Sequence, residues 1–230
     1  ASVFDKTLKK ELVDQSSKYK LGQVIYGVGG DFTGDKEWWG PVPEKIVFNE
    51  LTGKSVEAGA RGPLFSSAKC KAAMKRFRSI ELETILYEQE RRIQFVVRLN
   101  KEMTFDREAL YVAFPFAGAN PQFRYEVGGG HVKPNDEHLP GGCRDWFAVQ
   151  RWVTVHSDDA AVIWSPVDTP LITLCDLTPG KWLDTLPITN GTVFAYCLNN
   201  YWFTNYKAGQ DGNFTFRFDL TSGKSFDPQA

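Results

Sequence analysis

The stretch RSIELETILYEQERRIQFVVRLN (Arg78–Asn100) decides the fold class of this 230-residue chain. In its second half, the four odd positions from Ile93 to Leu99 are all apolar. A helix with about 3.6 residues per turn would scatter these positions around its axis, whereas a strand places alternate side chains on one face. The second half of the stretch is therefore predicted to be a β-strand.

The first half alternates in the same way, although a helix is the competing interpretation. The positions that share one face are Ile80, Leu82, Thr84 and Leu86, with Glu81 and Glu83 opposite them. Leu82, Ile85 and Leu86 also fit a helical stripe, and Glu and Arg are good helix formers. Because the second half excludes a helix, we predict two strands joined by the polar segment YEQERR (Tyr87–Arg92) into a long antiparallel hairpin.

Further stretches extend the β pattern along the chain. FTFRFDL (Phe214–Leu220) alternates cleanly, and GTVFAYCLNNYW (Gly191–Trp202) is apolar on both parities, which is typical of a strand buried on both faces. QFRYEV (Gln122–Val127) is another strand, whereas Pro115 within ALYVAFPF (Ala109–Phe116) favours an edge strand or a bulge. We predict an all-β chain, a large antiparallel β-sandwich, forming a single domain over residues 1–230.

Composition excludes several classes of partner and site. Basic residues number 27 and acidic residues 28, so net charge provides no attraction to nucleic acid or to an anionic membrane, and neither is expected as a partner. No apolar run approaches the roughly 20 residues of a membrane-spanning helix. The four Cys contain no CxxC pair, and buried free thiols are expected, with one or two disulfides as the open alternative. The basic run KCKAAMKRFR (Lys69–Arg78) is interpreted as a solvated strand face.

The segment GGGHVKPNDEHLPGGCRDWFAVQRWV (Gly128–Val153) concentrates His, Trp and charged residues among glycines. A metal site formed by His131, Asp136 and His138 is conceivable, because imidazole and carboxylate groups bind zinc. Their spacing matches no familiar ligand pattern, and prolines interrupt the segment. We interpret the first part as a surface loop and predict no metal or cofactor in this chain. HSDD, which begins at His156, is interpreted as a hairpin tip.

From Asp145 onward the segment reads as a strand with two different faces. Apolar residues occupy the odd positions Phe147, Val149, Val153 and Val155, with Arg151 as an exception. The even positions form a polar and aromatic face, which consists of Arg144, Trp146, Gln150, Trp152 and His156. Two Trp beside Gln and Arg can stack on a sugar ring and bind its hydroxyls, unless another sheet or domain covers them. LNNYWFTNYKAGQ (Leu198–Gln210) has the same character. The candidate carbohydrate-binding or cleft-rim residues are His131, Arg144, Asp145, Trp146, Gln150, Trp152, Asn199, Asn200 and Trp202.

Four segments of the chain, taken together, resemble one known family. They are ELVDQSSKYKLGQVIY (11–26), ALYVAFPF (109–116), FRYEVGGGHVKPNDEHLPGGCRDWFAVQRWV (123–153) and NNYWFTNYKAGQ (199–210). Their order and content resemble the C-terminal β domains of bacterial α-mannosidase-like enzymes of glycoside hydrolase family 38. The resemblance runs over nearly the whole chain and implies a galactose mutarotase-like supersandwich.

The resemblance also implies where the chemistry lies. In that family the carboxylate nucleophile and the zinc ligands belong to an N-terminal α/β barrel-like domain, which is followed by a helical bundle. Retaining hydrolysis there passes through a covalent glycosyl-enzyme. This chain is expected to be a fragment of such a longer multidomain enzyme, with no catalytic residue of its own. Its expected partners are the parent's N-terminal catalytic and helical domains and carbohydrate, and zinc is expected only in the catalytic domain.

Two alternatives stay open at this stage. The chain could be an autonomous carbohydrate-binding module that depends on Trp146 or Trp202. It could also be a mutarotase-like enzyme acting on free sugars, which needs a general acid and a general base facing one ring. The nominated pair for that chemistry is His131 with Asp145 or Glu126.

Overall fold

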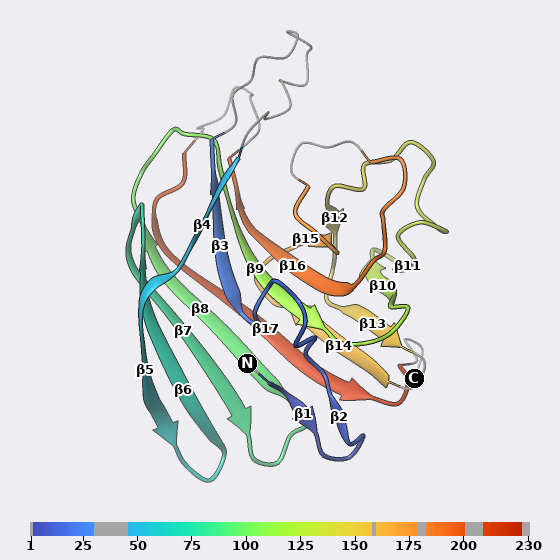
Figure 1. The fold of residues 1–230 in the computed structure, drawn as a ribbon, viewed down its shortest axis with the longest axis horizontal. Coiled ribbons are helices and arrows are strands. Elements are labelled where there is room, and N and C mark those ends of the chain that lie inside the picture. Colours follow the sequence, from blue (N-terminus) through green and yellow to red (C-terminus); the bar gives the residue numbers. More distant parts are fainter. Residues whose placement is uncertain (1, 30–45, 158–159, 179–182, 201–208, 227–230) are drawn as a thin grey trace, which may run out of the picture.

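The structure is a computed structural model that describes residues 2–29, 46–157, 160–178, 183–200 and 209–226. None of these residues lies in a helix, and the strands form two large antiparallel sheets and one short pair (Figure 1). The predicted large antiparallel β-sandwich is therefore confirmed.

The larger sheet has nine strands in the order β11-β10-β13-β14-β17-β8-β7-β6-β5. Its strands are β5 (Thr52–Arg61), β6 (Phe65–Met74), β7 (Phe77–Tyr87), β8 (Ile93–Lys101), β10 (Gln122–Val127), β11 (Gly130–Val132), β13 (Val153–Ser157), β14 (Ala160–Pro166) and β17 (Gly212–Gly223). The smaller sheet has six strands in the order β12-β15-β16-β9-β3-β4. Its strands are β3 (Gln23–Val28), β4 (Val47–Glu50), β9 (Glu108–Phe116), β12 (Phe147–Ala148), β15 (Leu171–Leu174) and β16 (Gly191–Asn199). The short strands β1 (Phe4–Asp5) and β2 (Lys10–Glu11) pair with each other.

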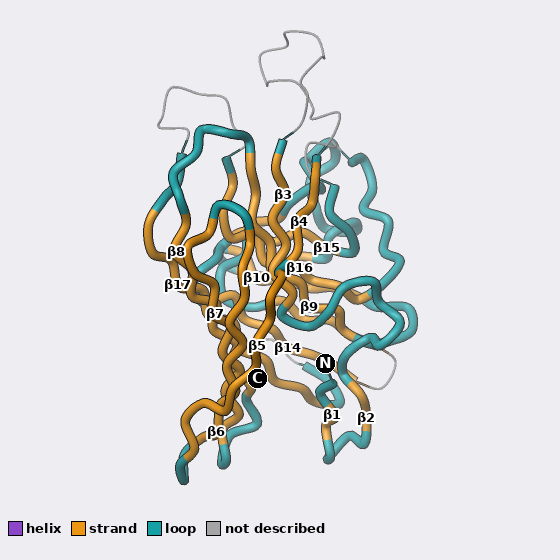
Figure 2. The backbone as a smooth tube through the Cα atoms, turned by 60° about the vertical axis from the view of Figure 1, so that its left-hand side comes forward, coloured by secondary structure: helices purple, strands orange, loops and turns teal. Residues whose placement is uncertain are grey.

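The hairpin predicted over Arg78–Asn100 is present as β7 and β8, which pair from Phe77 opposite Lys101 to Leu86 opposite Ile93. Ile80 is buried between the two sheets, as its parity predicts. Leu86 lies on the same face but is exposed, because β5–β7 extend beyond the six-stranded sheet. Figure 2 shows the β5–β6 hairpin reaching away from the rest of the molecule. This uncovered part of β5–β7 is called the overhang below.

The outer face of the nine-stranded sheet carries rows of opposite charges. Lys69 Nζ lies 3.6 Å from Glu81 Oε1, and Arg98 Nη1 lies 2.8 Å from Glu83 Oε2. Cross-strand pairs of this kind each stabilise a partly exposed face by about 1 kcal/mol or less. The basic run that begins at Lys69 is therefore a solvated strand face, as predicted.

The prediction that Pro115 marks an edge strand or a bulge is wrong. Pro115 lies in β9, at the centre of the six-stranded sheet between β16 and β3. Its neighbour β3 pairs only as far as Gln23 opposite Ala113, so no β3 residue lies beside Pro115. The Pro115 carbonyl accepts instead from Asp14 N at 2.9 Å. In a strand, the N and the carbonyl of one residue point the same way, so the missing N–H of Pro115 faces the side where β3 has ended and the segment around Asp14 lies instead.

A buried ion pair joins β8 to β9. Lys101 and Glu108 are each 1% exposed, and Lys101 Nζ lies 2.5 Å from Glu108 Oε1. Lys101 Nζ also donates to the carbonyls of Glu102 and Gln210, at 3.0 and 2.8 Å. The Tyr26 hydroxyl donates to Glu108 Oε2, and burial together with this carboxylate holds the pKa of Tyr26 far above its usual range. The charges are thus compensated inside the core.

The four cysteines are unpaired thiols, and among them Cys175 is fully buried. Burial raises the pKa of the Cys175 thiol above its usual value. The expectation of free thiols is confirmed, although three of the four are only partly buried. Over the part of the chain that the structure describes, no helix could span a membrane.

Candidate functional site

The segment after Asp145 crosses from one sheet to the other. Phe147 and Ala148 form β12 of the six-stranded sheet, whereas Val153 begins β13 of the nine-stranded sheet. The inward parity is as predicted, since Phe147, Val149, Val153 and Val155 are all buried. The prediction that the even positions form a single face is wrong. The outer faces of two stacked sheets point in opposite directions, so Trp146 and Trp152 lie on different sides of the sandwich.

Trp152 lies on the outer face of the nine-stranded sheet with His131. Their ring centroids are 6.2 Å apart, and Phe226 packs on Trp152 at 4.9 Å. Arg124 Nη1 donates to His131 Nδ1 over 2.9 Å. The chain's own C-terminal segment therefore partly covers Trp152, which leaves less of this face open for stacking on a sugar than the sequence suggested.

His156 lies beside this cluster on β13, and burial followed by the positive charge of Arg124 lowers its pKa. A histidine whose pKa is lower in the folded than in the unfolded state stabilises the fold above the unfolded value of about 6.5 and loses that contribution as pH falls below it. We therefore expect wild-type protein to lose stability relative to His156→Gln between about pH 7 and 5, by well under the roughly 1.4 kcal/mol per pH unit that one proton allows, because solvent screens a partly exposed ring. Urea unfolding at several pH values measures this difference. Parallel curves for the two proteins would contradict it.

Among the described residues, no hydrogen bond joins His131 to either of the nominated carboxylates, and Arg124 is the hydrogen-bond partner of His131. Glu126 is the cross-strand neighbour of His131, but Arg151 Nε contacts both of its carboxylate oxygens, at 3.0 and 2.9 Å. These bonds hold the pKa of Glu126 below its usual value, which makes it a weak base. Asp145 is buried and accepts from the Thr178 hydroxyl at 3.0 Å.

Trp146 packs on the opposite side of the molecule, over the outer face of the six-stranded sheet. It joins an aromatic cluster with Tyr111 and Tyr196, whose ring centroids are 4.5 Å apart. Tyr19 and Phe194 belong to the same cluster and pack edge to face. These contacts make Trp146 part of the cover of β9 and β16 and thus a contributor to the fold.

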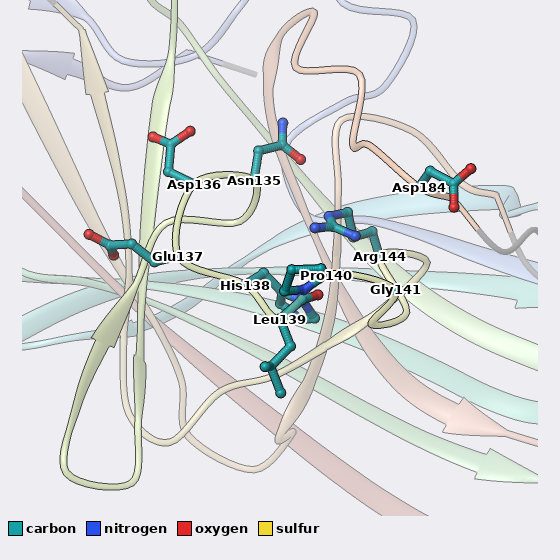
Figure 3. Close-up of a pocket in the computed structure, with 9 residues that line it drawn as sticks. All are labelled: Asn135, Asp136, Glu137, His138, Leu139, Pro140, Gly141, Arg144 and Asp184. Atoms are coloured by element: carbon teal, nitrogen blue, oxygen red, sulfur yellow. The ribbon is translucent and has the colours of Figure 1, made fainter.

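A pocket of about 540 Å³ lies under the loop between β11 and β12 (Figure 3). Its lining residues are Asn135, Asp136, Glu137, His138, Leu139, Pro140, Gly141, Arg144 and Asp184. Arg144 is only 6% exposed, and its Nη1 donates to the Gly142 carbonyl at 3.2 Å. Of the predicted residues that the structure describes, Arg144 lines this pocket.

The remaining predicted residues are dispersed. Asn200 is buried, and its Nδ2 donates to the Asp106 carbonyl at 2.9 Å, which holds the loop before β9. Asn199 ends β16, and Gln150 is exposed where the chain crosses between sheets. Trp202 lies outside the described residues. Among the residues that are described, no group of three or more His, Cys, Asp or Glu is placed to hold a metal ion.

The sequence did not predict two features of the structure, the pocket and the overhang. The pocket depends on Asp184, which is distant in sequence from the loop, so no local pattern indicates it. The overhang exposes apolar residues that alternate normally along their strands; Val56, for example, is 77% exposed. Parity identifies the face of a strand but does not reveal whether another layer covers it.

The family model described as glycosyl hydrolases family 38 C-terminal domain matches residues 1–162. No curated protein sequence matches the chain. Two solved structures share the fold. An α-mannosidase from Enterococcus faecalis V583 is 16% identical with a TM-score of 0.64, over 96% of this chain and 27% of that one. A glycosyl hydrolase family 38 protein from Enterococcus faecalis is 14% identical with a TM-score of 0.63, over 96% and 28%.

The chain thus spans about a quarter of the length of those two proteins. A galactose mutarotase-like protein from Lactobacillus casei is also similar, at 11% identity and a TM-score of 0.47, over 96% of this chain and 92% of that one.

Proposed function

Because the chain belongs to the family of glycosyl hydrolase family 38 C-terminal domains, we propose that it is the non-catalytic β domain of a retaining α-mannosidase-like enzyme. It packs on the parent's N-terminal catalytic and helical domains and shapes the carbohydrate cleft. The nucleophile and the zinc ion of the parent belong to the catalytic domain.

The observation that carries the non-catalytic role is the state of the buried carboxylates. Retaining hydrolysis needs two carboxyl groups on either side of the scissile bond, one of them able to exchange a proton. Among the described residues, four carboxylates are buried, namely Glu83, Glu108, Glu126 and Asp145. Each is held by other side chains of the fold: by Arg98, by Lys101 with Tyr26, by Arg151 and by Thr178, respectively. Groups engaged in this way support the fold and are poorly suited to attack a sugar.

The overhang supports the docking role. Between it and the edge of the six-stranded sheet runs a groove of about 370 Å³ whose apolar lining includes Leu21, Leu51, Val56 and Leu82. Apolar surface that is rimmed by polar groups commonly marks a protein interface. Lys18, Lys20 and Lys54 stand along this groove and would meet polar groups at the rim of such an interface.

The cleft-shaping role is assigned to the side of the sandwich where Arg144 and Asp145 lead into Trp146. The other candidates on the outer face of the nine-stranded sheet, His131 and Trp152, lie on the far side from Trp146. One cleft cannot contain both groups. We therefore restrict the proposed rim to the loop that ends at Arg144 and to the residues directly after it.

A complementation experiment tests this function. Chain 1–230 alone, given aryl α-mannosides and zinc, should show no turnover above background, and adding the parent's upstream region should produce it. Val56→Asp would place a charge in the proposed interface and should weaken complementation about tenfold or more.

Val167→Asp is the matched control, because Val167 is exposed outside the groove and the same change there should leave complementation intact. Turnover by chain 1–230 alone that disappears when one of its carboxylates is replaced would overturn the proposal.

A further inference from the structure

We infer that the pocket under the 133–144 loop is a binding site for a neutral, hydroxyl-rich ligand of the size of one pyranose ring. The pocket is lined by the buried guanidinium of Arg144, which pairs with no carboxylate of the described residues, and by the carboxylates of Asp136, Glu137 and Asp184. Its volume of about 540 Å³ falls in the range of about 300–1,000 Å³ that small-molecule sites occupy.

The loop that forms the pocket is fixed before any ligand binds. Asn135 Nδ2 donates to the Leu186 carbonyl and Leu186 N donates to Asn135 Oδ1, both at 2.9 Å. Lys133 N donates to Glu137 Oε2 at 2.9 Å. The His138 ring packs edge-on against Phe147 at 5.6 Å, and Gly142 is in van der Waals contact with that ring, since a Cβ there would come within 2.6 Å of it. A preformed pocket avoids the cost of ordering a loop on binding.

Arg144 is the observation that points to a ligand. Its Nε is buried and has no hydrogen-bond partner within the part of the chain that is described. Nη1 donates to the Gly142 carbonyl, and no carboxylate of the described residues forms an ion pair with the guanidinium. Figure 3 shows the guanidinium among the lining side chains. A buried guanidinium needs acceptors, so this one calls for oxygen atoms supplied from inside the pocket.

The other lining groups define what carries those oxygens. Asp136, Glu137 and Asp184 are carboxylates that only accept hydrogen bonds, and Arg144 only donates. Asp136 lies 3.9 Å from Lys133 Nζ and Glu137 lies 3.8 Å from Arg124 Nη1, which leaves Asp184 to offset Arg144. The charges around the pocket therefore balance, which favours a neutral ligand over an anion or a cation. A hydroxyl can donate to a carboxylate and accept from a guanidinium at the same time. Leu139 and Pro140 offer an apolar surface for the C–H face of a ring.

The choice of a sugar among polyols rests on the proposed function, whereas the preference for neutral hydroxyl groups rests on the pocket. Binding is therefore measured separately from turnover. Isothermal calorimetry or ligand-observed NMR of chain 1–230 would use methyl α-mannoside, myo-inositol and mannose 6-phosphate as probes. Methyl α-mannoside should bind with a dissociation constant on the order of 1 mM, as expected for a few hydrogen bonds.

Arg144→Met should weaken this binding tenfold or more, and Asp184→Asn, at an exposed position, should weaken it several-fold without risk to the fold. Trp152→Ala, on the outer face of the nine-stranded sheet and outside the pocket lining, should leave the binding of methyl α-mannoside unchanged. Three results overturn the inference: no binding of methyl α-mannoside at concentrations about tenfold above that constant, binding that Arg144→Met and Asp184→Asn leave intact, or stronger binding of the phosphate than of the neutral sugar. Binding of myo-inositol equal to that of the mannoside would overturn the sugar assignment. Failure of complementation would leave these binding results standing.

Discussion

The Lys101→Met variant is expected to lose about 3–5 kcal/mol of unfolding free energy, because removing one member of a buried ion pair leaves the other charge uncompensated. Glu108 is 1% exposed, so water cannot replace the ammonium that lies 2.5 Å from its carboxylate. Tyr26 donates one hydrogen bond to that carboxylate, but a single hydroxyl does not neutralise the charge. The loss would be a large part of the 5–15 kcal/mol that typically stabilises a domain. Urea unfolding followed by Trp fluorescence measures it.

The double variant Lys101→Met/Glu108→Gln separates the charge from its packing. With both charges removed, the remaining side chains have similar volumes, and most of the lost stability should return, since replacing a buried pair by uncharged groups is often nearly neutral. Arg76→Met is the matched control on a surface pair, where Arg76 Nη2 lies 2.8 Å from Asp106 Oδ2; its cost should stay within about 1 kcal/mol. A double variant as unstable as Lys101→Met would show that Lys101 acts through packing and its two carbonyl contacts.

Local alternation predicted much of the fold because a strand exposes its two faces within a few residues. The β7–β8 hairpin and the inward side of Phe147–Val155 follow directly from parity. Parity carries no information about which sheet a strand joins. Trp146 and Trp152 share a parity, yet the chain changes sheets between Ala148 and Val153, which places them on opposite sides.

For the candidate site, too, local sequence does not reveal long-range packing. Arg144 could be named from the sequence because a charged residue beside Trp suggested polar recognition. Its burial and its unpartnered Nε depend on how the loop is fixed to Leu186, far along the chain. Asn200 also looked like a sugar-binding amide, but its side chain bonds to the loop before β9. Residue type predicts what a side chain can bind, and long-range packing decides whether a ligand can reach it.

The proposed docking groove and the proposed sugar pocket lie on separate parts of the surface, so each can bind its own partner. The groove lies at the β4–β5 side of the sandwich, whereas the pocket lies near β11 and β12, at the opposite end of both strand orders. A domain that docks through one end can present the other end to substrate without competition between the two contacts. Val56→Asp and Arg144→Met should therefore act independently, the first on complementation and the second on sugar binding.

The Phe114→Ala variant is expected to lose about 3–5 kcal/mol, because it opens a cavity at the centre of the core. Phe114 is 0% exposed on β9, and its ring meets three aromatic residues of the facing sheet. The distances between ring centroids are 5.5 Å to Phe95, 5.1 Å to Trp164 and 5.1 Å to Phe218. Aromatic pairs of this kind each add about 0.5–1.5 kcal/mol beyond the area they bury. Among the described residues, no other aromatic side chain contacts three aromatic rings of the facing sheet.

Phe105→Ala is the matched control for this cavity. It removes the same atoms from a side chain that is 72% exposed, so it should change the unfolding free energy by no more than about 0.5 kcal/mol. Phe114→Leu should fall between the two, because Leu refills part of the space. Thermal and urea unfolding of the three variants give the order directly. If Phe114→Ala were as stable as Phe105→Ala, the two sheets would not be held together by this aromatic cluster, and the core would have to be anchored elsewhere along β9.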